Sequence, residues 1–167
     1  MTPPYWSYRT PNWVIFDLDG TLADIKHRLH FIYPTTAQEK FAAKTGDYKP
    51  DWDAFNMACE KDNTKPDIIE LLKMLQFYGK SIAIFSGRME TARERTIEWL
   101  RRNGVKYDIL EMRASKDFRS DVEIKSEMFF KHFTKEQIWF VVDDRDKVVD
   151  FWRELGLTCL QCQKGDY

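Results

Sequence analysis

The chain has 167 residues, of which 43% are hydrophobic and 32% charged, a balance that suits one globular domain and excludes disordered and low-complexity classes. Its 26 Lys and Arg residues against 27 Asp and Glu residues give a formal charge of −1, so contact with nucleic acid would need a local patch. Three cysteines make no disulfide framework, and we find neither a secretory signal nor a membrane-spanning run, so we expect a cytoplasmic protein without membrane contact.

Short, continuously apolar runs predict buried strands. The clearest are Trp13–Phe16, Ile82–Phe85 and Ile138–Val142, and weaker candidates are Asp108–Arg113 and Leu157–Leu160. Hydrophobicity that does not alternate along a strand is typical of parallel sheets covered on both faces.

Amphipathic patterns between these runs predict helices. They extend from Pro66 to Gly79, from about Glu90 to Gly104, from about Asp121 to His132, and from about Asp146 to Gly156. The alternation of strands and helices predicts an α/β fold, a doubly wound parallel sheet, in a single domain over residues 1–167.

One segment, about 24–65, interrupts this alternation after the first strand. It contains no core strand, and weak helical patterns lie near 37–43 and 52–59. We therefore expect a small, mainly helical, cap-like insertion where a lid would lie.

The strongest functional signal is the pair Asp17 and Asp19 directly after the first strand. Parallel sheets bind ligands at the carboxyl ends of their strands, and alternation along the chain places both side chains on one side. Gly20 permits a tight turn behind them. Two adjacent carboxylates can bind a hard cation, or one of them can hold a proton.

Three further groups lie at the same expected edge. Ser86–Arg88 follows the second clear strand, Lys125 lies one turn after Asp121 on a helix, and Asp143–Asp144 follows the third clear strand. Each alone is explained as a turn, a helix cap or a solvated side chain. Together they supply a nucleophilic carboxylate, an acid, a lysine, a hydroxyl and metal-binding acids, which favours phosphoryl transfer.

These residues resemble a known superfamily. Asp17-Leu-Asp-Gly-Thr, Ser86, Lys125 and Asp143-Asp144 are similar to the four motifs of haloacid dehalogenase (HAD) phosphotransferases, and Asp19 is typical of the phosphatases among them. More specific matches resemble the 3′-phosphatase domain of phage-type polynucleotide kinase-phosphatases, namely Ser86-Gly87-Arg88, Asp121 to Lys125, Asp143-Asp144-Arg145, and the tail from Trp152 to Gly165-Asp166-Tyr167. Arg28 falls where that family has an active-site arginine.

The resemblance implies a role for each position. Asp17 would form an aspartyl-phosphate, Asp19 would act as acid and base, and Lys125 would neutralise charge. Substrate-binding positions would be Thr21, Arg28, Ser86, Gly87, Arg88 and Asp121. The implied cofactor is Mg²⁺, bound by Asp17, the Asp19 backbone carbonyl, Asp143 and Asp144.

The implied function is Mg²⁺-dependent removal of 3′-phosphates from DNA or RNA ends. One alternative is a phosphatase of free nucleotides or other small phosphate esters, with the insertion closed over the site and Trp52 holding a base. An inactive binding module ranks last, because every expected catalytic position is filled. The kinase half of the phage-type enzyme has no counterpart in the chain, which leaves room for a separate kinase or ligase partner.

Overall fold

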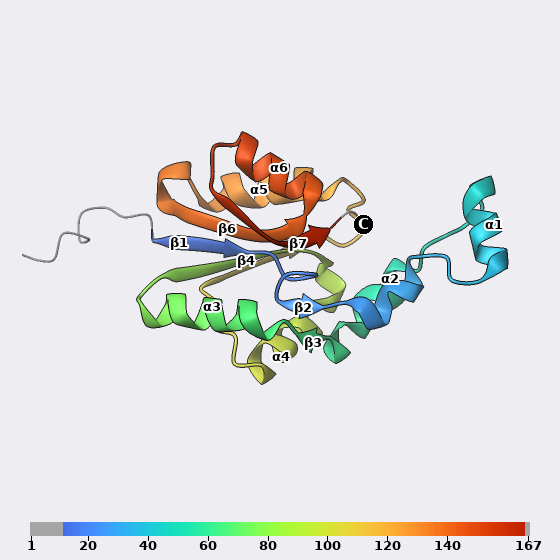
Figure 1. Cartoon of the computed structure of the whole chain (residues 1–167), viewed down its shortest axis with the longest axis horizontal. Coiled ribbons are helices and arrows are strands. Elements are labelled where there is room, and N and C mark those ends of the chain that lie inside the picture. The colour runs from blue at the N-terminus through green and yellow to red at the C-terminus, as the bar shows by residue number, and fades with distance from the viewer. Residues whose placement is uncertain (1–11, 166–167) are drawn as a thin grey trace, which may run out of the picture.

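A computed structural model describes residues 12–165, in which a five-stranded parallel sheet lies at the centre (Figure 1). Its strands lie in the order β5–β4–β1–β6–β7, with bounds β1 Trp13–Phe16, β4 Ser81–Met89, β5 Ile109–Arg113, β6 Ile138–Arg145 and β7 Cys159–Gly165. The predicted doubly wound sheet is confirmed. Residues 1–11, on which the expectation about a secretory signal depends, and Asp166-Tyr167 of the tail motif lie outside the described residues.

The apolar runs form strands because both faces of the sheet are covered. Val14 and Phe16 pack into one core, while the intervening Ile15 packs into a second core on the opposite face. This division follows from the two-residue period of side chains along a strand.

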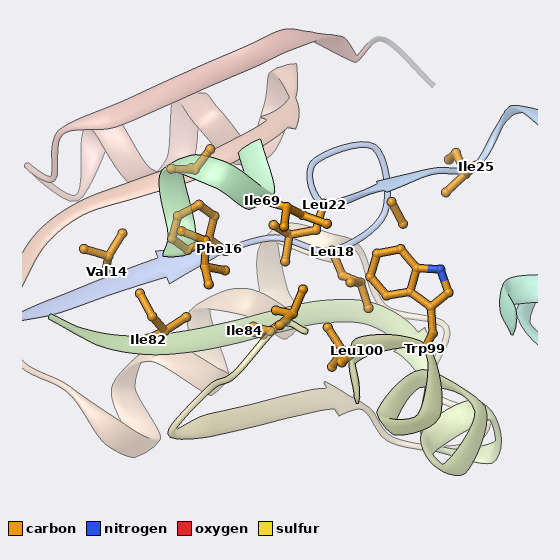
Figure 2. Packing of buried hydrophobic residues seen from close by; sticks show 14 of the residues in the cluster. Val14, Phe16, Leu18, Leu22, Ile25, Ile69, Ile82, Ile84, Trp99 and Leu100 are labelled. Carbon is orange, nitrogen blue, oxygen red and sulfur yellow. The ribbon is translucent and has the colours of Figure 1, made fainter. Parts of the chain in front are cut away.

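Two pairs of helices build these cores (Figure 1). On one face lie α3 (Pro66–Phe77) and α4 (Arg93–Arg102), and on the other lie α5 (Asp121–His132) and α6 (Asp146–Glu154). Figure 2 shows Trp99 and Leu100 of α4 and Ile69 of α3 in the first core, together with residues of β1 and β4. Within residues 12–165, every helix is too short or too polar to cross a membrane.

Several predicted boundaries need correction. The strand expected over Leu157–Leu160 begins at Cys159 and continues to Gly165. Ser86–Arg88 and Asp143–Asp144 do not follow their strands but lie within β4 and β6. Strand pairing depends on the backbone and continues through polar side chains, although the register shifts in both places, between Ser86 and Met89 and between Asp143 and Arg145. In addition, the helix expected from Glu90 begins as a 3-10 turn, Glu90–Ala92, and becomes α-helical at Arg93.

The segment expected as an insertion is bounded by a short antiparallel pair, β2 (Ala23–Asp24) and β3 (Asn63–Thr64). Between these strands lie α1 (Ala37–Thr45), α2 (Trp52–Met57) and two 3-10 helices, Lys26–Phe31 and Ala58–Lys61. No residue of α1 is buried, and Figure 1 shows this helix projecting away from the sheet. By contrast, α2 buries Phe55 in the first core, next to the strand ends.

Candidate active site

A buried lysine joins two carboxylates at the carboxyl edge of the sheet. Lys125 of α5 donates hydrogen bonds from Nζ to Asp17 Oδ1 at 2.6 Å and to Asp143 Oδ2 at 2.8 Å. Trp152 of α6 also donates to Asp143 Oδ2, at 3.2 Å. The Asp17 backbone amide donates to the Val142 carbonyl at 2.9 Å, which continues the β1–β6 ladder and fixes where the carboxylate emerges.

Burial and charge act on this cluster in opposite directions. Burial raises the pKa of Asp17 well above its usual value, the Lys125 charge lowers it, and Asp143 and Asp144 raise it further. Burial also disfavours charge on Lys125, but the carboxylates of Asp143 and Asp17 outweigh burial and raise the pKa of this lysine. Lys125 is therefore positively charged at neutral pH.

The geometry of three acids fits a hard cation. Asp17, Asp143 and Asp144 each offer a carboxylate oxygen, and these oxygens lie within 4.8 Å of one another. Among residues 12–165, Asp17 Oδ2 is the one buried side-chain oxygen or nitrogen that lacks a hydrogen-bond partner. A divalent cation bound by oxygen ligands, such as Mg²⁺, would satisfy this atom and offset the repulsion among the carboxylates.

Asp19 lies in a different electrostatic environment. Its Oδ1 accepts hydrogen bonds from Arg28 Nη2 at 2.7 Å and from Arg88 Nε and Nη2 at 2.8 and 2.6 Å. Burial alone would raise the pKa of Asp19, but Arg28 and Arg88 outweigh burial and lower this pKa to about 2. Asp17 and Asp19 therefore have pKa values shifted in opposite directions although they are two residues apart.

Sequence reasoning missed Asp62, which lies at the end of the insertion. This buried carboxylate accepts hydrogen bonds from Arg28 Nε and Nη2 at 2.7 and 2.8 Å and from Arg88 Nη2 at 2.6 Å. His27 Nε2 lies 2.8 Å from Asp62 Oδ1. Asp62 belongs to no motif, and the only available signal was that two arginines beside one carboxylate require a second counter-charge.

Arg28 and Arg88, which we expected to contact the substrate, pair with carboxylates of the protein in this structure. Both guanidinium groups are fully buried, between Asp19 and Asp62. Arg28 also donates to the Phe55 carbonyl at 3.2 Å, with its guanidinium carbon 4.1 Å from the centre of the Phe55 ring. In this structure both arginines therefore hold the Asp19 carboxylate, and their contact with a substrate stays a prediction.

Asp121 also has contacts that the sequence did not reveal. It accepts hydrogen bonds from Arg113 Nη2 and Arg145 Nη1, and Arg113 Nε donates to the Gly87 carbonyl at 3.0 Å. A Cβ atom at Gly87 would lie 3.2 Å from Asp121 Oδ1, so the glycine permits this close approach. The N-cap of α5 is Ser120, so Asp121 is the first residue of the helix and does not cap it.

A cavity of about 640 Å³ opens over the site. Six of the expected site residues line it, namely Asp17, Asp19, Gly87, Asp121, Lys125 and Asp144. The others lie behind this lining, namely Thr21, Arg28, Ser86, Arg88 and Asp143, all of them buried. Ser86 Oγ accepts from the Arg88 amide at 3.1 Å, and Thr21 Oγ1 lies 3.7 Å from Cys162 Sγ.

The chain is similar to known phosphatase domains. Residues 51–167 match the family described as the polynucleotide kinase PNKP phosphatase domain. The chain is similar to a solved chain from the Pnkp1/Rnl/Hen1 RNA repair complex, with 32% identity and a TM-score of 0.75 over 95% of this chain and 44% of that one. This chain thus spans less than half the length of that relative.

More distant structures share the fold. A haloacid dehalogenase-like hydrolase from Streptococcus pneumoniae is 16% identical, with a TM-score of 0.63 over 91% of this chain and 84% of its own. A class C acid phosphatase from Bacillus anthracis is 21% identical, with a TM-score of 0.50 over 78% of this chain and 51% of its own. At these identities the likeness concerns the fold alone.

Proposed function

The chain belongs to the family of PNKP phosphatase domains within the HAD phosphatases, and on this premise we propose that it is a Mg²⁺-dependent phosphomonoesterase that removes 3′-phosphates from DNA or RNA ends. The observation that carries the proposal is the buried Asp17 carboxylate, which has one oxygen bound by Lys125 and the other without a hydrogen-bond partner in residues 12–165. The similarity to a chain of an RNA repair complex favours polynucleotide ends over the alternative of free nucleotides.

Asp17 is the proposed nucleophile. One of its oxygens attacks phosphorus, the bond from phosphorus to the leaving 3′-oxygen breaks, and an aspartyl-phosphate forms on Asp17. Lys125 holds the carboxylate in one orientation and offsets part of the negative charge that develops. Mg²⁺ bound by Asp17, Asp143 and Asp144 would supply the positive charge that lets an anionic carboxylate approach an anionic phosphate.

Asp19 is the proposed acid and base. It gives a proton to the leaving 3′-oxygen in the first step. In the second step it takes a proton from the water that attacks the phosphorus of the aspartyl-phosphate, which breaks the bond from phosphorus to Asp17 and releases inorganic phosphate. Each cycle therefore returns the proton to Asp19. Arg28 and Arg88 favour the carboxylate form, which the second step needs, and an anionic phosphate bound nearby favours the protonated form, which the first step needs.

Phosphate release tests the proposed function. We expect Mg²⁺-dependent release from a 3′-phosphorylated oligonucleotide to exceed release from 3′- and 5′-mononucleotides. Asp17→Asn abolishes turnover, whereas Asp24→Asn, a change at a partly exposed carboxylate of β2, leaves it unchanged. A preference for mononucleotides would retain the chemistry and overturn the substrate, and turnover by Asp17→Asn would overturn the covalent mechanism.

We also propose that the protein acts together with partner enzymes of end repair, such as a kinase or a ligase, since a relative 32% identical to it was solved within the Pnkp1/Rnl/Hen1 RNA repair complex. Tagged protein should then co-purify with a kinase or a ligase from an extract of its own cells. Recovery of neither would contradict the proposal.

A further inference from the structure

The cavity over Asp17 has an apolar wall that the proposed chemistry does not use. The insertion contributes Trp52 and Phe55 of α2, together with Ile25 and Ile32, and Met89 at the end of β4 completes the wall. Phe55 is buried, whereas Trp52 is 44% exposed, and their ring centres lie 5.7 Å apart at an angle of 84°. The exposed Trp52 indole thus packs on the buried Phe55 ring, and both side chains line the cavity that contains Asp17.

The remaining lining forms a second wall that is mostly charged, although it also includes Phe118, Val122 and Val148. Most of its cations are paired, as Arg113 and Arg145 are with Asp121, and Arg119 is with Asp117. Lys147 differs, because it is exposed, lines the cavity and makes no hydrogen bond or ion pair within the described part of the chain. It lies in the first turn of α6, so its ammonium group is available to a ligand.

The two walls come from opposite faces of the sheet. Phe55 of α2 packs into the first core and Val148 of α6 packs into the second, with the strand ends between them (Figure 1). A ligand whose phosphate reaches Asp17 therefore lies between an aromatic surface and an unpaired cation. The terminal nucleotide of a nucleic acid has both matching features. It carries a planar base, and a second phosphate joins it to the rest of the nucleic acid.

We propose that the cavity is a subsite for the terminal nucleotide of a polynucleotide, in which the base stacks on Trp52 and the adjoining phosphodiester contacts Lys147. This inference rests on the proposed function and deepens it. Stacking on an aromatic side chain is strong and tolerates every base. The ammonium contact gives a strand an advantage over a mononucleotide, which has no second phosphate.

The subsite is also tolerant of base identity. Asn56 is the amide side chain on the apolar wall, and both of its polar atoms are engaged by the protein. Its Nδ2 donates to the Trp52 carbonyl at 2.7 Å, and its Oδ1 accepts from the Met89 amide at 3.2 Å. Sequence is read by hydrogen bonds to base edges, so a wall without a free partner binds all bases alike.

Binding to the inactive Asp17→Asn protein tests the subsite without turnover. The probe is a fluorescent 3′-phosphorylated oligonucleotide, compared with the same strand ending in an abasic residue and with a competing 3′-mononucleotide. Trp52→Ala and Lys147→Ala are measured in this background. The matched controls are Phe77→Ala and Lys106→Ala, which change exposed residues that precede β4 and β5 at the opposite edge of the sheet.

We expect Trp52→Ala to weaken binding of the normal strand by about 10-fold, to leave the abasic-ended strand unchanged, and to be rescued by Trp52→Phe. We expect Lys147→Ala to weaken binding of the strand by about 3- to 10-fold and to lower the slope of log affinity against log salt by about 0.7. The same variant should bind the mononucleotide as before.

Three results would overturn the subsite. The first is that Trp52→Ala and Lys147→Ala bind the oligonucleotide as their controls do, and the second is that Trp52→Ala loses as much affinity for the abasic-ended strand as for the normal one. The third is that the oligonucleotide does not bind to Asp17→Asn at all. Failure of the proposed function is distinguishable from these. Suppose that protein with Asp17 in place releases no phosphate from the oligonucleotide, while binding still depends on Trp52 and Lys147. The proposed reaction then fails and the subsite stands.

Discussion

Replacing Asp62 with Asn removes a buried negative charge that the sequence did not reveal. The carboxylate accepts three hydrogen bonds from Arg28 and Arg88, and these arginines also hold Asp19. Asn has nearly the same shape, but it lacks the charge and turns donor hydrogens toward guanidinium groups that are themselves donors. Two buried cations would then share the single carboxylate of Asp19.

The expected loss of stability is large. Removing one partner from a buried ion pair costs about 3 to 5 kcal/mol, because the remaining charge is left uncompensated. The Asp19 carboxylate still offsets part of that charge, so we expect about 3 kcal/mol. In a protein of 150 to 250 residues, this corresponds to a fall in Tm of roughly 6 to 12 °C.

Asp62→Asn should also lower activity, although Asp62 does not line the cavity. General acid–base catalysis contributes about 100- to 10,000-fold to a reaction rate, so partial displacement of Asp19 should lower kcat by about 10-fold. KM should change little, because Asp62 lies outside the cavity in which the phosphate would bind.

Urea unfolding and steady-state kinetics measure both effects. The matched control is Asp24→Asn, which removes a partly exposed carboxylate paired with Lys26 at 3.7 Å, and we expect it to cost less than about 1 kcal/mol. If Asp62→Asn unfolds at the same urea concentration as Asp24→Asn and retains its kcat, then the paired arginines do not depend on Asp62 and the reasoning is refuted.

Three further predictions follow from the same cluster. Saturating Mg²⁺ should raise Tm by about 5 to 10 °C in thermal unfolding, since a ligand at 100 times its Kd adds about 2.7 kcal/mol, and Asp144→Asn should lose most of this shift. Lys125→Met should lower kcat by at least about 100-fold, measured as phosphate release, and a near-normal kcat would contradict its role. The pKa of Asp19 is lowered to about 2 by folding, so its contribution of roughly 2 kcal/mol is present above about pH 4 and lost as pH falls toward 2. The difference in unfolding free energy between the unsubstituted protein and Asp19→Asn should shrink over that interval, and a constant difference would refute the assignment.

The sheet could be predicted because burial leaves a clear pattern. The bounds of β1 agree with its apolar run, since a central strand covered on both faces needs hydrophobic residues throughout. The bounds of α5 were also predicted, because the helix begins with an acidic first turn after Ser120 and ends with basic residues. The full lengths of β4 and β6 could not be predicted, since their polar ends pair through the backbone and leave no hydrophobic pattern.

The acids and the lysine of the site could be inferred because they follow the apolar runs of buried strands or lie on the adjoining helix. The contacts of Arg28 and Arg88 could not be inferred, since these depend on Asp62, which folding brings back from the end of the insertion. Long-range pairs between charged side chains have no sequence period. A motif can therefore indicate that an arginine belongs to a site without indicating whether it faces the substrate or another residue.

The proposed covalent mechanism requires a phosphoryl group bonded to Asp17. A strand carrying a radiolabelled 3′-phosphate, mixed rapidly with the Mg²⁺-loaded protein and quenched in acid, should leave label on the protein. The label should appear before free phosphate does, and it should be absent from Asp17→Asn. Rapid phosphate release with no label on the protein at any quench time, together with turnover by Asp17→Asn, would contradict the covalent mechanism.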